Sequence, residues 1–260
     1  MKHQDFAFLY ELEEDLWWFA GMREITAVLL DEFLPPLPER KILDAGCGTG
    51  GMISWLERYA AKENIFGIDV VKDALVFCRE RDQKLLAQAS ATALPFPDST
   101  FDLVTSFDVI VQIPGEHSDI AALREMYRVA SPGGIVFARV AAYNWMRSGH
   151  DEALETQRRY TLKRFSRKME SVGFKMMRAT YANSFLLPVA AVRRLLLKRI
   201  GLAKKGSDVQ PPSKNTAWLN RGLRSFLLRE AKILRRPNAK LPAGLSAICI
   251  ARKPFDGENT

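Results

Sequence analysis

The sequence predicts an α/β protein with a mostly parallel seven-stranded sheet and helices on both faces. Short β-type runs alternate with amphipathic helical patterns over most of the chain, which is typical of parallel sheets. The first such run ends in a glycine-rich turn, 46–51, that leads directly into a helical pattern. With 260 residues, 47% of them hydrophobic, the chain can bury the core of one large domain.

The elements follow in a regular order up to the last strand. Residues 1–40 predict two helices, 6–20 and 22–33, which prolines terminate and which we expect to form a cap. The expected strands are 41–45, 64–70, 85–89, 101–107, 135–142, 174–181 and 245–252, and the helices between them are 52–60, 72–82, 118–130 and 162–172. We therefore expect the main domain to comprise 41–183 and 243–254.

Residues 184–242 interrupt this alternation before the last strand. They contain two helical patterns, 188–200 and 218–235, separated by a polar Gly/Pro linker, 206–214. Positions 193–240 hold fourteen Lys or Arg against two acidic residues, a surplus of +12, so the rest of the chain sums to −4 within the net +8. A basic insertion of this kind indicates contact with a membrane surface, a phosphorylated substrate or nucleic acid, with a solvated basic face as the alternative.

Cysteine usage and the N-terminal residues favour the cytoplasm. The three cysteines lie far apart, so the sequence predicts no disulfide framework and no metal site. The N-terminus is acidic where an export signal would be basic and then apolar. The longest apolar stretch, 185–192, is well short of the roughly 20 residues that span a bilayer.

The turn after the first strand predicts a nucleoside-binding site. Glycines let the backbone approach a ligand, and the acid Asp69 at the end of the second strand is placed to accept hydrogen bonds from ribose hydroxyls. The glycine spacing is G-x-G-x-G, preceded by Asp44. A carboxylate there suits the ammonium of a methionine moiety and repels a pyrophosphate, which disfavours a nicotinamide oxidoreductase. A plain tight turn is the other interpretation.

The segment ILDAGCGTG at 42–50 closely resembles the first motif of class I S-adenosylmethionine-dependent methyltransferases. Residues 94–102, and the helix and turn within 123–134, agree with that family in order and distance. The resemblance covers about 40–142 and is nearest to the branch that acts in quinone and other small-molecule pathways. It implies a Rossmann-like class I methyltransferase fold, S-adenosyl-L-methionine as cofactor, and a small-molecule or lipid-linked acceptor.

A weaker resemblance, to bacterial methyltransferases of polysaccharide and lipid assembly, extends over most of the chain. It rests on Tyr10, the Trp-Trp-Phe run at 17–19, Arg23, the Arg-Arg-Tyr-Thr run at 158–161, and LPAGLS at 241–246. The aromatic run is predicted either to pack on the domain core or to cap the cofactor beside its cationic sulfur.

The class I resemblance assigns cofactor-binding residues position by position. It implies that Asp44, Gly46, Gly48 and Gly50 hold the methionine end and that Asp69 holds the ribose. It also implies that Ser90 and Ala91 bind the adenine. The family usually has an acid at the position of Ser90, so here the adenine amino group is expected to contact the Ser90 hydroxyl or the backbone. The adjoining positions Cys47, Val70 and Phe107 complete the candidate set.

The residues expected to face the methyl acceptor follow less distinctive sequence patterns than the cofactor-binding residues. Methyl transfer from a sulfonium needs alignment of the nucleophile, and a base only where that nucleophile loses a proton. The candidates are Gln112 after the fourth strand, Tyr143 after the fifth, and His150 in the next loop. His150 is either a general base or an ordinary loop histidine.

The 218–235 helix is predicted to be two-sided, with an apolar and a basic face. The apolar set is Trp218, Leu219, Leu223, Phe226, Leu227, Ile233 and Leu234, and the basic set is Arg221, Arg224, Arg229 and Lys232. Such a helix packs on the catalytic domain or lies on an anionic membrane or lipid-linked acceptor. The second case implies peripheral contact with the inner membrane face.

Two other functions remain as alternatives. A nucleic-acid methyltransferase is disfavoured, at least for base amines, because residues 107–112 lack the Asn/Asp-Pro-Pro-aromatic motif typical of those enzymes. A non-catalytic, cofactor-binding scaffold is the second. The sequence leaves the oligomeric state open.

Overall fold

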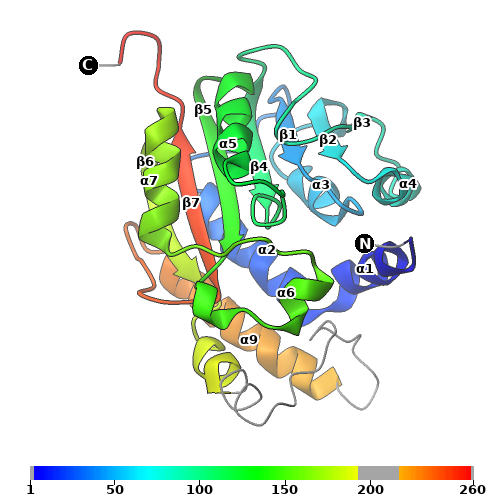
Figure 1. Ribbon diagram of the computed structural model, residues 1–260, viewed down its shortest axis with the longest axis vertical. Helices are drawn as coiled ribbons and strands as arrows, with labels where there is room; N and C mark the ends of the chain where they lie inside the picture. Colours follow the sequence, from blue (N-terminus) through cyan, green and yellow to red (C-terminus); the bar gives the residue numbers. More distant parts are fainter. Residues whose placement is uncertain (1–2, 193–216, 259–260) are drawn as a thin grey trace.

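A seven-stranded sheet in the order β3-β2-β1-β4-β5-β7-β6 runs through the centre of the computed structural model (Figure 1). The strands are β1 Ile42–Ala45, β2 Ile65–Asp69, β3 Leu86–Gln88, β4 Phe101–Phe107, β5 Ala130–Ala141, β6 Lys175–Ala182 and β7 Ser246–Arg252. Strands β1 to β5 pair in parallel, whereas β7 is antiparallel to both β5 and β6. The mostly parallel seven-stranded sheet is confirmed.

The structure describes residues 3–192 and 217–258, with side chains except at 3–5, 150 and 153. The helices are α1 His3–Asp15, α2 Trp17–Leu30, α3 Gly51–Leu56, α4 Lys72–Glu80, α5 Ser118–Val129, α6 Gly149–Ala153, α7 Leu162–Val172 and α9 Ala217–Leu234, with 3-10 turns at Lys62–Asn64 and Asn144–Met146. Residues 187–192 are also helical. The rest of the predicted 188–200 helix and the 206–214 linker lie outside the described residues.

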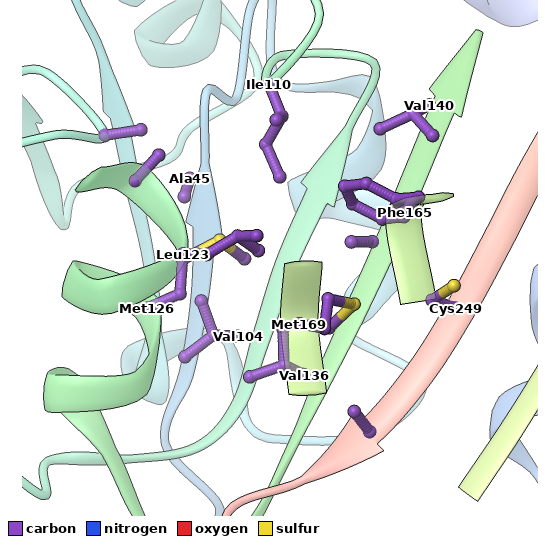
Figure 2. Close-up of a cluster of buried hydrophobic side chains, with 14 of the residues drawn as sticks. Ala45, Val104, Ile110, Leu123, Met126, Val136, Val140, Phe165, Met169 and Cys249 are labelled. Atoms are coloured by element: carbon purple, nitrogen blue, oxygen red, sulfur yellow. The ribbon is translucent and has the colours of Figure 1, made fainter. Parts of the chain in front are cut away.

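The two faces of the sheet carry separate apolar layers because side chains alternate along each strand. Figure 2 shows the layer beneath α5 and α7, where Leu123, Met126, Phe165 and Met169 pack on strand residues such as Val104. The opposite layer joins the other strand positions to α2, α3 and α9. Residues 131–134, predicted as a turn before the 135–142 strand, instead belong to β5, which a register shift between Phe101 and Leu103 accommodates.

The break between the first two helices lies at Leu16, so the predicted boundary near residue 21 is wrong. Leu16 has extended backbone dihedrals, φ −74° and ψ 130°. This break forms an elbow between α1 and α2, which Asn220 of α9 holds with two hydrogen bonds. Its Oδ1 accepts from Trp17 N at 2.8 Å, and its Nδ2 donates to Asp15 O at 2.9 Å. A side chain two hundred positions away thus supplies the hydrogen bonds that local sequence could not reveal.

Gly21 lies inside α2, where it lets α9 pack closely (Figure 1). A Cβ at this position would lie 2.4 Å from Leu227 Cδ1 and 2.5 Å from Leu227 Cβ. The glycine predicted to separate two helices therefore serves helix–helix contact instead.

The predicted single apolar face of α9 is divided in the structure. Leu227, Ala231 and Leu234 are buried together with Glu230. The exposed large apolar side chains on the same helix are Trp218, Leu219, Phe226 and Ile233. Packing on the domain thus accounts for only one stripe of the apolar surface, and the other faces outward.

We predict that Gly21→Ala lowers the free energy of unfolding by about 1–3 kcal/mol, because the added Cβ overlaps the Leu227 side chain at its base. Urea unfolding measures the change. The matched control is Gly222→Ala in α9, where nothing lies within 4 Å of the new Cβ. There, removing a helical glycine should stabilise by roughly 0.5–1 kcal/mol, and equal effects at both positions would contradict this account of Gly21.

Candidate functional site

The glycine-rich turn after β1 adopts a backbone that glycine alone takes easily. Gly46, Gly48 and Gly50 have φ values of +96°, +54° and +86°. A Cβ at Gly46 would meet Val109 at 2.2 Å, whereas nothing lies within 4 Å of Gly48. The first glycine therefore lets the β4 loop approach, and Gly48 leaves the backbone open to a ligand.

Asp69 stands at the end of β2 in direct contact with this turn. Its Oδ2 accepts from Gly48 N at 3.0 Å, and its Oδ1 accepts from Val71 N at 2.9 Å. Burial raises the pKa of Asp69, although these backbone donors oppose the shift. Each carboxylate oxygen retains acceptor capacity for a further hydroxyl. The neighbouring Val70 is exposed.

The turn after β3 meets the same edge of the sheet. Ala89 N donates to Asp69 O at 3.0 Å, which places Ser90 and Ala91 beyond the carboxyl end of β2. The Ser90 hydroxyl lies 2.8 Å from Thr92 Oγ1. Cofactor-binding candidates from three strands are thus brought to one edge.

Cys47 contributes to the turn through its backbone. Its side chain is buried, with Sγ 3.8 Å from Cys78 Sγ, and both thiols are free. Hydrogen bonding to Cys78 and burial raise the pKa of Cys47, so this thiol stays protonated. Among the described residues, no group of His, Cys, Asp and Glu is arranged to hold a metal ion.

Asp44 is a buried carboxyl group directly in front of the turn. It is 1% exposed and accepts from Thr105 Oγ1 at 2.8 Å. Burial raises its pKa to about 7, against the opposing hydrogen bond from Thr105; Glu13 and Asp69 add to the rise, and Arg139 opposes it. At neutral pH the free site therefore exchanges between the protonated and ionised acid, and a bound cation would favour ionisation.

A buried guanidinium, which is not among the residues predicted from the sequence, lies beside the end of β4. Arg139 of β5 pairs with Phe107, the last residue of β4, and is 4% exposed. Its Nε donates to Asp108 Oδ2 at 2.8 Å, and its Cζ lies 4.7 Å from the Trp18 ring centroid and 5.2 Å from that of Phe107. The available signal was one arginine within an otherwise apolar strand.

Glu13 of α1 is a second residue absent from the predicted site. It is buried, and its Oε2 accepts from Thr49 Oγ1 at 2.6 Å and from Gly51 N at 3.1 Å, with Arg81 Nη2 at 3.3 Å. The carboxylate thus binds the N-terminal end of α3, where negative charge is favourable. Burial raises the pKa of Glu13 nonetheless.

Tyr143, an acceptor-side candidate, lies in an aromatic stack. Its ring centroid is 5.3 Å from that of Tyr181 and 5.7 Å from that of Trp145. Burial, helped by Tyr181, raises the pKa of Tyr143 to about 12. The phenol therefore stays protonated at neutral pH and could orient an acceptor by hydrogen bonding.

The loops that carry the three acceptor-side candidates are joined through residues 157–160. Gln157 N donates to Val111 O at 2.8 Å, next to Gln112, and Tyr143 N donates to Tyr160 O at 2.9 Å. His150 lies on α6, and its side chain is outside the described residues.

A buried ion pair also ties α6 to the strand edge. Arg159 Nε lies 2.6 Å from Asp151 Oδ1, and its Nη1 donates to Ala142 O at 2.8 Å. The helix that bears His150 is therefore anchored next to β5.

Residues 43–138 match a family described as a methyltransferase domain, a range that includes every cofactor-binding candidate above. This segment of the chain is therefore similar to a methyltransferase domain. Over 98 residues it is 36% identical to a fatty-acid O-methyltransferase of Mycolicibacterium smegmatis, covering 36% of this chain and 35% of that protein. Over 130 residues it is 34% identical to a demethylmenaquinone methyltransferase of Thermus thermophilus, covering 48% and 57%.

A third relative, the malonyl-acyl-carrier-protein O-methyltransferase of Erwinia billingiae, is 33% identical over 127 residues, covering 47% of this chain and 48% of the relative. The chain thus spans between about a third and somewhat more than half the length of these three relatives.

Solved structures agree on the fold over almost the whole chain. An S-adenosylmethionine-dependent methyltransferase from Mesorhizobium loti superposes with a TM-score of 0.55 at 16% identity, over 90% of this chain and 97% of that one. The cyclase SpnF superposes with a TM-score of 0.55 at 20% identity, over 89% and 82%. A likeness at this identity establishes the class I fold.

Asp44 gives a prediction about stability and pH. Its pKa is raised on folding from 3.8 to about 7, so the folded state binds the extra proton and stability falls as pH rises across that window. Asp44→Asn cannot ionise, so its free energy of unfolding relative to wild type should be higher at pH 8 than at pH 5, by about 2–3 kcal/mol, since the wild type loses about 1.4 kcal/mol per pH unit between pH 5 and the folded pKa.

Chemical denaturation at pH 5 and pH 8 tests this difference. Asp82→Asn is the matched control, since Asp82 is exposed beside Lys62 and the ion pair lowers its pKa, leaving it ionised at both pH values. A wild-type minus Asp44→Asn difference that stays constant with pH would mean that Asp44 is not the titrating group.

Proposed function

We propose that the protein is an S-adenosylmethionine-dependent methyltransferase that acts on a small-molecule or lipid-linked acceptor. The observation that carries the proposal is the pairing of buried Asp44 with an open glycine turn, held against Asp69, inside the matched domain. An acid in front of the turn selects a cationic amino group over a pyrophosphate.

Within this proposal the cofactor lies along the carboxyl edge of β1, β2 and β3. Asp44 binds its ammonium, the Gly46–Gly50 backbone supports the methionine end, and Asp69 accepts from the ribose hydroxyls. Ser90 and Ala91 border the adenine. When bound, the cofactor supplies an electrophilic methyl group on a sulfonium sulfur.

The acceptor then approaches from the loops after β4 and β5. Gln112 and Tyr143 orient the nucleophile, and His150 on α6 removes a proton where the nucleophile carries one. The protein's contribution is mainly alignment of an in-line displacement. Residues 1–40 cover the site as a cap on the 41–183 and 243–254 catalytic domain, an arrangement supported by the contact of Glu13 with the turn.

The named relatives support the acceptor class. They act on a fatty acid, on demethylmenaquinone and on a malonyl group carried by a protein. These acceptors are small or lipid-like, and none is a nucleic acid.

Asp69→Ala should weaken S-adenosylmethionine binding on the order of 10- to 100-fold, because hydrogen bonds to a charged group contribute about 1.5–3 kcal/mol. Isothermal titration calorimetry measures the affinity. Asp102→Ala is the matched control, since Asp102 belongs to β4 but bonds Lys41 N at the opposite end of the sheet. Unchanged affinity in Asp69→Ala would remove Asp69 from the site, and NAD binding of comparable strength would indicate an oxidoreductase.

The same wild-type protein, incubated with methyl-labelled cofactor and with lipid, sugar-nucleotide or RNA fractions, identifies the acceptor class. Label is expected in the lipid or small-molecule fractions. Label confined to RNA would establish the nucleic-acid alternative, and cofactor binding without transfer would indicate a scaffold.

We further propose that residues 184–242 hold the enzyme against an anionic membrane, at the inner face in a cytoplasmic setting. Within the described residues no helix is long and apolar enough to cross a bilayer. The outward stripe of α9 is bordered by Phe185, whose ring lies 6.1 Å from that of Phe226. Phe185, Val189 and Val192 repeat at helical spacing and are all exposed.

Glu230 fixes these two apolar segments relative to each other. It is fully buried and accepts from Asn183 N at 2.7 Å and Phe185 N at 2.8 Å. Basic residues flank the patch, with Arg229 Cζ 5.6 Å from the Phe226 ring centroid. Exposed apolar side chains edged by cations fit the interface of an anionic bilayer.

Binding to vesicles of phosphatidylglycerol and phosphatidylcholine should be strong at low salt and should fade as salt rises, because each nearby basic residue contributes about 1 kcal/mol that is screened over a Debye length. Arg221→Glu/Arg224→Glu should weaken it at least tenfold in a co-sedimentation assay.

The matched control for vesicle binding is Arg164→Glu/Arg167→Glu, an exposed pair at the same spacing on α7. Equal loss in both double variants would mean a non-specific charge effect. Absence of wild-type binding to anionic vesicles at low salt would leave the segment as ordinary domain packing.

A further inference from the structure

Asp44 and Arg139 project from the same face of the sheet at its carboxyl edge. Asp44 is paired with Thr105 of β4, and two positions further along β4, Phe107 is paired with Arg139 of β5. Side chains at paired positions and at every second residue share a face. An acid and a guanidinium therefore flank the end of β4 from the two neighbouring strands, on the side covered by α2.

The Arg139 side chain is buried, yet most of its hydrogen-bonding capacity is unused by the described residues. Only Nε donates to a described residue, Asp108, whose side chain is 29% exposed. The Nη atoms therefore have no hydrogen-bond partner among the described residues, and the Trp18 and Phe107 rings lie against the guanidinium carbon. Neither Nη atom is among the fully buried side-chain atoms that lack a hydrogen-bond partner.

The surrounding charges select the kind of group that this guanidinium can bind. Two parallel N–H donors match the two oxygens of a carboxylate or of a phosphate. Asp44, Glu13 and Asp69 lie close enough to one another to influence the ionisation of Asp44, so the site already holds three acids. A doubly charged phosphate would be repelled more strongly there than a singly charged carboxylate.

We propose that Arg139 binds a carboxylate in the candidate site, an inference that rests on the proposed function. The first source of that carboxylate is the amino-acid end of the cofactor, whose ammonium lies at Asp44. Asp44 and Arg139 then recognise the two charges of one zwitterion. The second source is an acceptor that is itself a carboxylate. Its oxygen would form a bond to the methyl carbon as the carbon–sulfur bond breaks and its electron pair returns to sulfur, which gives a methyl ester and S-adenosylhomocysteine without needing a base.

The test uses Arg139→Gln and Arg139→Lys in the full-length protein. Calorimetry compares S-adenosylhomocysteine with its decarboxylated analogue, S-adenosyl-3-thiopropylamine, and a third titration uses dodecanoate in the presence of S-adenosylhomocysteine. Arg58→Gln is the matched control, because Arg58 also contacts two aromatic rings, Trp55 and Tyr59, and pairs with Asp31 away from the site.

If Arg139 binds the cofactor carboxylate, Arg139→Gln should weaken S-adenosylhomocysteine binding on the order of 10- to 100-fold and leave the decarboxylated analogue within about twofold. If it binds the acceptor, both nucleosides should keep their affinities, and dodecanoate binding should fall by a similar factor. Arg139→Lys should restore part of either loss, since it keeps the charge and lacks the paired donors.

Three results separate the possible failures. The proposal is overturned if both nucleosides and dodecanoate bind Arg139→Gln as tightly as they bind the wild type. It is also overturned if the nucleoside affinities are unchanged and dodecanoate binds neither protein. In both cases Arg139 only anchors α2. If both nucleosides weaken equally, Arg139 supports the fold of the site and binds no carboxylate. If the wild type binds neither nucleoside, the proposed function itself fails.

Discussion

The burial of an ionisable carboxyl group at Asp44 is the constraint on which the rest of the site depends. Taking a carboxylate out of water is costly unless hydrogen bonds and opposite charge compensate it. Here Thr105 supplies one hydrogen bond and Arg139 supplies a favourable charge, while Glu13 and Asp69 add to the cost. A cation bound beside Asp44 would offset part of this electrostatic cost.

Features set by local sequence were predictable, and features set by distant contacts were not. The alternation of strands and helices predicted the sheet, and the glycine spacing with Asp44 and Asp69 predicted a cofactor site at its carboxyl edge, which stays a prediction. The elbow at Leu16 was missed because it depends on Asn220. Glu13 was missed because nothing local distinguishes it from Glu14, and only the docking of α1 brings it to Thr49.

Helix α9 shows the same limit in another form. A helical wheel reports how wide an apolar arc is, but not how much of it a partner covers. The arc of α9 is wide enough to bury one stripe against α2 and leave a second exposed, with an acid, Glu230, inside the buried stripe. That acid is satisfied by backbone donors from the 183–185 turn, which no pattern within α9 could indicate.

The elbow held by Asn220 has a consequence for the order in which the chain folds. Its hydrogen bonds join positions 203 and 205 residues apart, so the bend between α1 and α2 gains these bonds only after α9 has left the ribosome. The strands that frame the glycine turn, from β1 to β5, are synthesised well before that. During synthesis the edge of the sheet that carries the glycine turn can thus assemble first, and the contact between α2 and α9, although α2 is made early, is among the last to form.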